Sequence, residues 1–197
     1  KHFNLLELLH NTNEITRMKA NEAGVNYYVE DGEIIHTQLI GSPVHFQQIL
    51  MNIGSNAVKY NHDGGSVTVT CREVSYTDIT AEYELTCTDT GISMSEEFQK
   101  RAFEPFAQEG QLARTKYAGT GLGLAIARKL TELQGGTLFF ESIQGKGTKF
   151  ILHISFEISA EEQEKKSHMY QNCSVEGIQV LLVEDNELNM EIAEFLL

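Results

Sequence analysis

Two glycine-bearing turns constrain this chain more than any other feature. The first, Asp89-Thr90-Gly91, ends an alternating run that predicts a strand, and the second, Gly119-Thr120-Gly121-Leu122-Gly123, leads into a helical pattern at Leu124. Glycines at alternate positions let backbone N–H groups approach an anion, and a helix N-terminus adds partial positive charge. The second turn is neither a Walker loop, since no Gly-Lys-Ser/Thr follows, nor a Rossmann fingerprint, since a loop rather than a strand precedes it.

The periodicity of residues 1–156 predicts a two-layer α/β sandwich, with three helices on a mixed, mostly antiparallel sheet. Helices are expected at residues 4–23, 43–60 and 122–134. Strands are expected at residues 25–29, 34–40, 67–74, 79–88, 137–143 and 148–156. The first two strands flank a short turn and are expected to form a hairpin.

Charge and cysteine content narrow the choice of partner and compartment. The formal net charge is −13, which argues against nucleic acid and anionic membranes as partners, because both need a basic surface. Cys71 and Cys87 lie in apolar alternating runs and are expected to be reduced core thiols, which indicates a cytoplasmic, reducing compartment. The chain lacks an initiating Met and ends abruptly, so we expect it to be a piece of a longer protein.

One face of the helix predicted at residues 43–60 is polar and carries Asn52, Asn56 and Lys59. Amide oxygens are hard ligands for Mg²⁺, and a lysine ammonium is a point charge for phosphate. The opposite stripe is apolar and is expected to face the core: Phe46, Ile49, Leu50, Ile53 and Ala57. The alternative is that the polar face is simply solvated.

The carboxylate of Asp89 follows a strand directly. It could accept a hydrogen bond from an exocyclic amine such as adenine N6, with Gly91 allowing close backbone approach. A plain strand-ending turn is one alternative. Another is the Asp-Thr-Gly of aspartic proteases, but that chemistry needs two such carboxylates and hence a homodimer here, which nothing else in the sequence supports.

The motifs occur in an order that closely resembles the catalytic, ATP-binding domain of sensor histidine kinases. They are Asn52–Tyr60, Asp89–Gly91, Phe103–Phe106, Gly119–Gly123 and Gly145–Thr148. The resemblance covers about residues 1–156. It implies the ATP-binding sandwich shared with type II topoisomerases, mismatch-repair ATPases and the large heat-shock chaperone, with ATP and Mg²⁺ as ligands.

The resemblance also implies roles for the residues on the polar helix face and at the first turn. Asn56 resembles the principal magnesium ligand, with Asn52 supporting it. Lys59 resembles the phosphate contact, and Tyr60 the ring that packs on adenine. Asp89 resembles the adenine-reading carboxylate, with Gly91 behind it and Ile92 as an apolar wall. Thr148 resembles a partner of Asp89 that acts through water.

The remaining motif residues resemble an ATP lid and its attachments. Phe103 and Phe106 resemble anchors of the lid, residues 107–118. Arg114 and Lys116 are the lid cations that could reach the γ-phosphate; the alternative for each is a solvated loop charge. The phosphate-cradling turn and lid hinge correspond to Gly119, Thr120, Gly121, Leu122, Gly123 and Leu124.

The family's phosphoacceptor histidine is expected to lie outside this chain. Seven histidines occur, and none has the family's His-Glu/Asp-x-x-Thr/Asn-Pro context. The resemblance therefore implies an upstream helical hairpin that carries the acceptor and makes the parent a homodimer. The parent can also be anchored in the inner membrane.

The charged composition of residues 157–176 predicts a linker. Residues 177–197 follow it and begin with an apolar run. A buried-type strand ends there at Glu184 and Asp185, which closely resembles the first strand of a response-regulator receiver domain. The acidic pair then matches the receiver's magnesium-binding pair. The alternative is a generic buried strand with an acidic turn. The resemblance implies a hybrid kinase whose own receiver takes part in a phosphorelay.

Three functions remain to be distinguished. The first is binding of Mg-ATP and donation of its γ-phosphoryl to a histidine on a separate domain. The second is a nucleotide-binding regulatory module without kinase activity, which predicts loss of Asn56, Asp89 or the glycines, whereas all are present. The third is another ATPase of the superfamily, which usually has a carboxylate base one turn before Asn56, where this chain has Asn52.

Overall fold

The structure is a computed structural model that describes residues 1–109 and 120–160. Its sheet has the strand order β1-β3-β7-β5-β4-β2, and β6 pairs with β7. The strands are β1 His2–Asn4, β2 Asn26–Asp31, β3 Gln38–Ile40, β4 Ser66–Tyr76, β5 Thr80–Asp89, β6 Thr137–Ile143 and β7 Gly147–Ile158. Only the β2–β4 pair is parallel among these strands. The predicted mixed, mostly antiparallel sandwich is confirmed.

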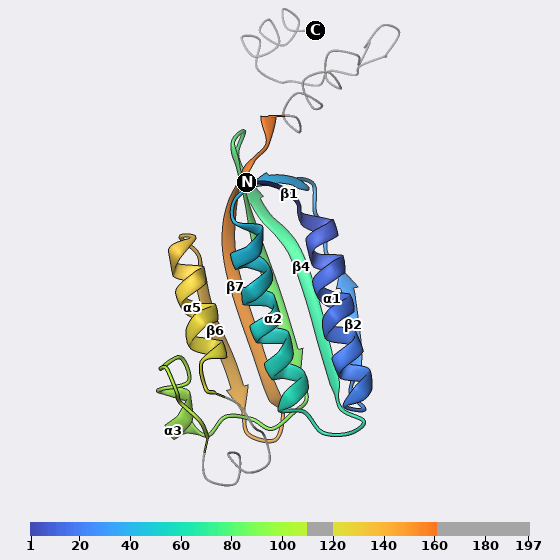
Figure 1. Ribbon diagram of the computed structural model, residues 1–197, viewed down its shortest axis with the longest axis vertical. Coiled ribbons are helices and arrows are strands. Elements are labelled where there is room, and N and C mark those ends of the chain that lie inside the picture. Colours follow the sequence, from blue (N-terminus) through green and yellow to red (C-terminus); the bar gives the residue numbers. More distant parts are fainter. Residues whose placement is uncertain (110–119, 161–197) are drawn as a thin grey trace, which may run out of the picture. The chain divides into compact units, whose positions relative to one another are not determined.

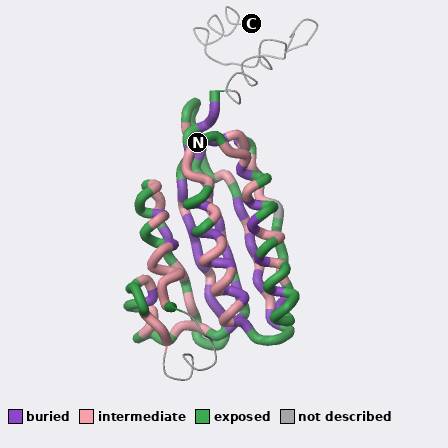
Figure 2. Tube along the Cα trace, viewed as in Figure 1, coloured by how far each residue is buried: buried purple, intermediate pink, exposed green. Residues whose placement is uncertain are grey.

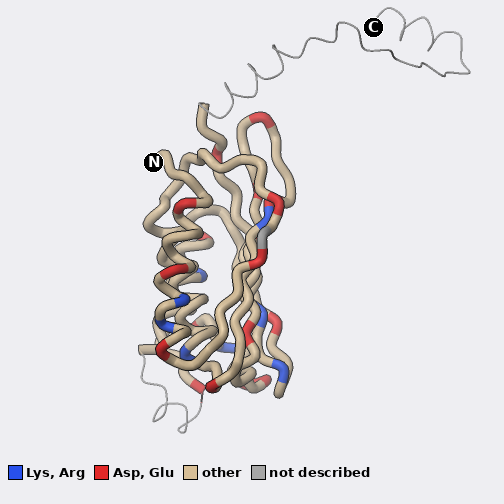
Figure 3. The backbone as a smooth tube through the Cα atoms, turned by 90° about the vertical axis from the view of Figure 1, so that its right-hand side faces the viewer, with Lys and Arg blue, Asp and Glu red and all other residues tan. Residues whose placement is uncertain are grey.

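Three long helices cover one face of this sheet and leave the other face open (Figures 1 and 3). They are α1 Leu5–Glu22, α2 Pro43–Lys59 and α5 Gly123–Leu133; the short helix α3 is Glu96–Gln99. The side chain of Asn4 caps α1 by accepting a hydrogen bond from Glu7 N at 2.9 Å. Within the described residues, no helix combines the length and the hydropathy that crossing a bilayer requires.

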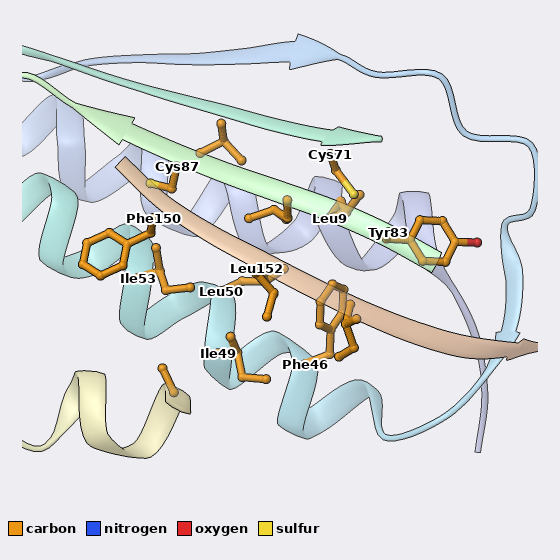
Figure 4. Packing of buried hydrophobic residues seen from close by; sticks show 14 of the residues in the cluster. Leu9, Phe46, Ile49, Leu50, Ile53, Cys71, Tyr83, Cys87, Phe150 and Leu152 are labelled. Carbon is orange, nitrogen blue, oxygen red and sulfur yellow. The ribbon is translucent and has the colours of Figure 1, made fainter. Parts of the chain in front are cut away.

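The hydrophobic core lies between the helices and the sheet (Figure 2). The predicted apolar stripe of α2 is buried there, where Ile49 and Ile53 face Leu152 of β7 (Figure 4). Gly54 lets α1 approach α2 closely, because a Cβ at this position would lie 3.0 Å from Thr16 Cγ2. Cys71 and Cys87 are buried, free thiols, as predicted.

The expected hairpin between residues 25–29 and 34–40 is wrong. Strand β2 instead pairs in parallel with β4, while β3 pairs with β1 and β7, and β1 itself was not predicted. A buried carboxylate contacts the loop between β2 and β3. Glu73 accepts hydrogen bonds from the backbone N of Ile35 and His36 at 2.8 and 2.9 Å, and its Oε1 lies 2.6 Å from His36 Nδ1. These contacts hold the connecting loop against β4.

Candidate functional site

A cavity of about 220 Å³ lies where the end of α2 meets the end of β5 and the start of α5. It gathers residues from every motif of the predicted site that the structure describes, except the aromatic segment. The predicted residues that line it are Asn56, Lys59, Tyr60, Asp89, Ile92, Thr120, Gly121, Gly123, Leu124 and Thr148. Residues far apart in the sequence are therefore brought together around one cavity.

Asp89 supplies a buried carboxyl group to this cavity, with 5% of its surface exposed. It ends β5 opposite Thr148 of β7, and its Oδ1 accepts a hydrogen bond from Gly91 N at 2.9 Å. Burial raises the pKa of Asp89 from 3.8 to about 6, although hydrogen bonds from the backbone of Gly91 and Thr148 oppose this shift. A buried carboxylate of this kind favours a ligand that brings its own hydrogen-bond donor.

Two glycines make the approach to Asp89 possible. A Cβ at Gly91 would lie 2.4 Å from the carbonyl oxygen of Tyr60, so only glycine lets this loop pack on the end of α2. Gly147 has a φ of 96°, and a Cβ there would lie 1.9 Å from the carbonyl oxygen of Asp89. The turn before Thr148 is thus fitted closely to the strand that carries Asp89.

The amide groups of α2 lie beneath the N-terminus of α5. A Cβ built at Gly123 would be 3.6 Å from Asn52 Oδ1 and 3.7 Å from Asn56 Nδ2. The Asn52 Nδ2 atom is buried and has no hydrogen-bond partner among the described residues. Amide groups beside a helix N-terminus fit a magnesium-bound polyphosphate, since the amide oxygens are hard ligands and the helix end favours negative charge.

Lys59 and Tyr60 close the same end of α2. The Lys59 ammonium lies 3.2 Å from the Tyr60 hydroxyl and 4.7 Å from the centre of its ring. Both side chains line the cavity. A cation and an aromatic ring therefore lie together in the cavity that also contains the carboxylate of Asp89 and the amide of Asn56.

Several predicted residues support the cavity without lining it in the described part of the chain: Asn52, Gly91, Phe103, Phe106 and Leu122. Phe103 packs against Phe140, with 5.4 Å between ring centres. Phe106 is 69% exposed and has a φ of 65°. Its backbone N donates to the carbonyl oxygen of Gly121 at 3.0 Å, so the two ends of the predicted lid are tied together.

Arg114, Lys116 and Gly119 lie outside the described residues, as do Glu184 and Asp185. Their predicted roles at the lid, the phosphate turn and the receiver strand stay predictions.

The profile of the histidine kinase-, DNA gyrase B- and HSP90-like ATPase family matches residues 41–158. The chain belongs to this ATPase family. It is 33% identical over 195 residues to the sensor histidine kinase AruS of Pseudomonas aeruginosa, and covers 19% of that protein. This match includes 99% of the present chain. The chain thus spans about a fifth of the length of this relative.

Solved structures of sensor kinases share the fold of this ATPase-family domain. The mycobacterial sensor histidine kinase MprB matches with a TM-score of 0.64 and 22% identity, covering 81% of this chain and 99% of that one. Full-length ShkA in complex with AMPPNP matches with a TM-score of 0.65 and 25% identity, covering 82% of this chain and 32% of that one. Both likenesses support the ATPase-family fold.

Sequence reasoning missed part of the wall of this ATPase-family cavity. The unpredicted lining residues are Met94, Phe98, Ala102 and Phe150, while Ala107 and Glu109 belong to the predicted lid. Most are ordinary apolar side chains, so their sequence positions alone do not distinguish a ligand wall from core. Glu109 accepts a hydrogen bond from Ser95 N at 2.7 Å, and it therefore joins the start of α3 to the start of the predicted lid.

Proposed function

We propose that this domain binds Mg-ATP and donates the γ-phosphoryl group to a histidine on a separate helical dimerisation domain, in two-component signalling. The observation that carries the proposal is the polarity of one cavity. The cavity combines a buried acceptor, Asp89, with the amide of Asn56 on α2 and the N-terminus of α5. A nucleotide needs both kinds of group: an acceptor for the adenine amino group, and N–H donors with a metal ligand for the polyphosphate.

At the base end, Asp89 accepts a hydrogen bond from the adenine amino group. The backbone N–H of Gly91 keeps the carboxylate oriented through its 2.9 Å hydrogen bond. Tyr60 and Ile92 line the cavity on the α2 side and offer apolar surface to the ring. Thr148 stands opposite Asp89 in the sheet and adds a hydroxyl to the same edge.

At the phosphate end, Asn56, supported by Asn52, holds Mg²⁺ through amide oxygens. The bound magnesium neutralises charge on the phosphates. Lys59 adds a positive charge, and the turn Thr120–Leu124 offers backbone N–H groups at the start of α5. Arg114, Lys116 and Gly119 are proposed to complete this end from the lid.

The nucleophile belongs to the partner domain, so this chain needs no catalytic base. Its contribution is to position the nucleotide and stabilise charge. We further propose the organisation of the parent: kinase domain at residues 1–156, linker at 157–176, and the start of a receiver at 177–197, with Glu184 and Asp185 as its magnesium pair. Such a parent is a homodimeric hybrid kinase that runs a phosphorelay.

Transfer of labelled phosphate tests the proposal. The chain is incubated with γ-labelled ATP and magnesium, alone and with the parent's upstream helical hairpin supplied as a separate polypeptide. We expect label on the hairpin and none on the chain, and no transfer with Asn56→Ala. Label on the chain alone contradicts a separate acceptor. Nucleotide binding without transfer to the hairpin supports the regulatory-module alternative.

A further inference from the structure

Two serine hydroxyls hold the β6–β7 turn against the loop that follows Asp89. Ser93 Oγ donates to Ile143 O at 2.7 Å and accepts from Gly145 N at 2.9 Å and from Gly147 N at 3.3 Å. Ser142 makes a different set of contacts. Its Oγ accepts from Met94 N at 2.9 Å and lies 3.0 Å from Thr148 Oγ1.

Among the hydrogen bonds of the described residues, Ser142 but not Ser93 reaches Thr148. Thr148 lines the cavity and is the strand partner of Asp89. Ser142 is therefore linked by one hydrogen bond to Thr148, a residue that lines the cavity. Both serines bond to the same turn, but of the two only Ser142 contacts Thr148 among the described residues.

The Ser142 hydroxyl has one proton to donate. One lone pair is already used by Met94 N–H. Two acceptors remain near it: Thr148 Oγ1 at 3.0 Å and Gly147 O at 3.4 Å. The second distance is long for a hydroxyl hydrogen bond, so the geometry favours donation to Thr148 over donation to Gly147. Thr148 then accepts the Ser142 proton, and its own hydroxyl proton is available to an acceptor other than Ser142.

We propose that Ser142 is a positioning residue for base selection, because it makes Thr148 a hydrogen-bond donor beside the acceptor Asp89. This inference rests on the proposed function. A 6-aminopurine offers a donor amine next to an acceptor ring nitrogen, which matches that pair. A 6-oxopurine exchanges the two, so it sets an acceptor against the Asp89 carboxylate and a donor against the Thr148 proton.

Ser142 is also tied to the wall of the cavity on the side of α3. The Gln99 side chain donates from Nε2 to Met94 O at 2.9 Å and to Ser142 O at 3.2 Å. The backbone of Ser142 is thus fixed independently of its hydroxyl. Removal of the hydroxyl alone is expected to free the orientation of the Thr148 proton while leaving the turn in place.

The test is calorimetric titration of Mg-ATP and Mg-ITP into the whole chain. The variants are Ser142→Ala, the conservative Ser142→Thr and the matched control Ser93→Ala. The wild-type chain is expected to prefer ATP. Ser142→Ala should reduce that preference about fivefold to tenfold, roughly the effect of one hydrogen bond. Ser142→Thr should retain the preference, and Ser93→Ala should weaken both nucleotides by the same factor.

The inference is overturned if Ser142→Ala weakens ATP and ITP equally, since that result means a structural role like that of Ser93. It is also overturned if the wild-type chain binds both nucleotides equally well. Either result leaves the proposed function standing, because ATP still binds. Failure of the wild-type chain to bind ATP at all refutes the proposed function together with the inference.

Discussion

The substitution Asp89→Asn separates nucleotide binding from folding because it changes charge with almost no change of shape. The asparagine oxygen can still accept the hydrogen bond that Gly91 N donates to Asp89 Oδ1 at 2.9 Å. Its NH₂ group then occupies the position of the second carboxylate oxygen. In the proposed complex, a donor would face the adenine amino group, which is also a donor.

We expect Asp89→Asn to weaken Mg-ATP binding about thirtyfold. A hydrogen bond to a charged group contributes about 1.5–3 kcal/mol, and a loss of about 2 kcal/mol corresponds to roughly thirtyfold in affinity. Calorimetric titration at pH 8 measures this difference directly. An unchanged affinity would show that Asp89 does not contact the base.

The same substitution is expected to stabilise the nucleotide-free fold. The pKa of Asp89 rises from 3.8 to about 6 on folding, a difference of about 2 units. At 1.36 kcal/mol per unit, ionisation of the buried carboxyl costs up to about 3 kcal/mol. A group whose pKa is raised on folding favours the folded state most below its unfolded pKa and loses this contribution as pH rises through the folded value.

Urea unfolding of the nucleotide-free chain tests this linkage. Asp89→Asn should raise the free energy of unfolding by about 1–3 kcal/mol at pH 8, and the difference should shrink as pH falls and vanish below the unfolded pKa of 3.8, where the Asp89 carboxyl is neutral in both states. Mg-ATP affinity of the wild-type chain should fall between pH 7.5 and 5.5, with a weaker dependence in the variant. Lower stability at pH 8 combined with weaker binding would refute the reasoning, since it would mean that Asn simply damages the fold.

Three further substitutions test the rest of the site and the fold. Gly147→Ala should lower the free energy of unfolding by more than about 2 kcal/mol in urea, because its Cβ would lie 1.9 Å from a carbonyl oxygen. The control Gly145→Ala should cost only about 1 kcal/mol, because the described residues leave space around its Cβ. Glu73→Ala should destabilise by about 3 kcal/mol, since it leaves the buried His36 ring without its carboxylate; a cost below 1 kcal/mol would contradict this account. Asn56→Ala should remove the magnesium dependence of nucleotide affinity, measured with and without a chelator, and a retained dependence would place the metal elsewhere.

Local sequence signals predicted the parts of the fold that short-range physics determines. The apolar stripe of α2 follows from helical spacing and is buried as predicted, and Asn56 and Lys59 of its polar face line the cavity. The turn at Gly91 was found because the motif combines a carboxylate with a glycine, and the structure shows that no side chain fits there. The boundaries of α1 followed from its cap at Asn4 and the positive φ of Gly24.

Contacts between distant segments could not be predicted in the same way. The turn at residues 30–33 has hairpin chemistry, yet β2 joins β4 in parallel, and the loop that follows β2 contacts Glu73, 37 residues from His36. Phe98 and Phe150 are apolar residues typical of a core, and only the packing of α3 and β7 makes them line the cavity. Such positions depend on tertiary structure rather than local pattern.

Hydrogen–deuterium exchange with and without Mg-ATP tests the central claim most directly. The account predicts protection of the amides at residues 89–94, 120–124 and 145–148, with β2 unchanged. That strand lies at the far edge of the sheet, where a second groove of about 320 Å³ is lined by α1 and β2 residues such as Leu9 and Val29. Protection of β2 without protection at Asp89 and the start of α5 would contradict the assignment of the nucleotide site.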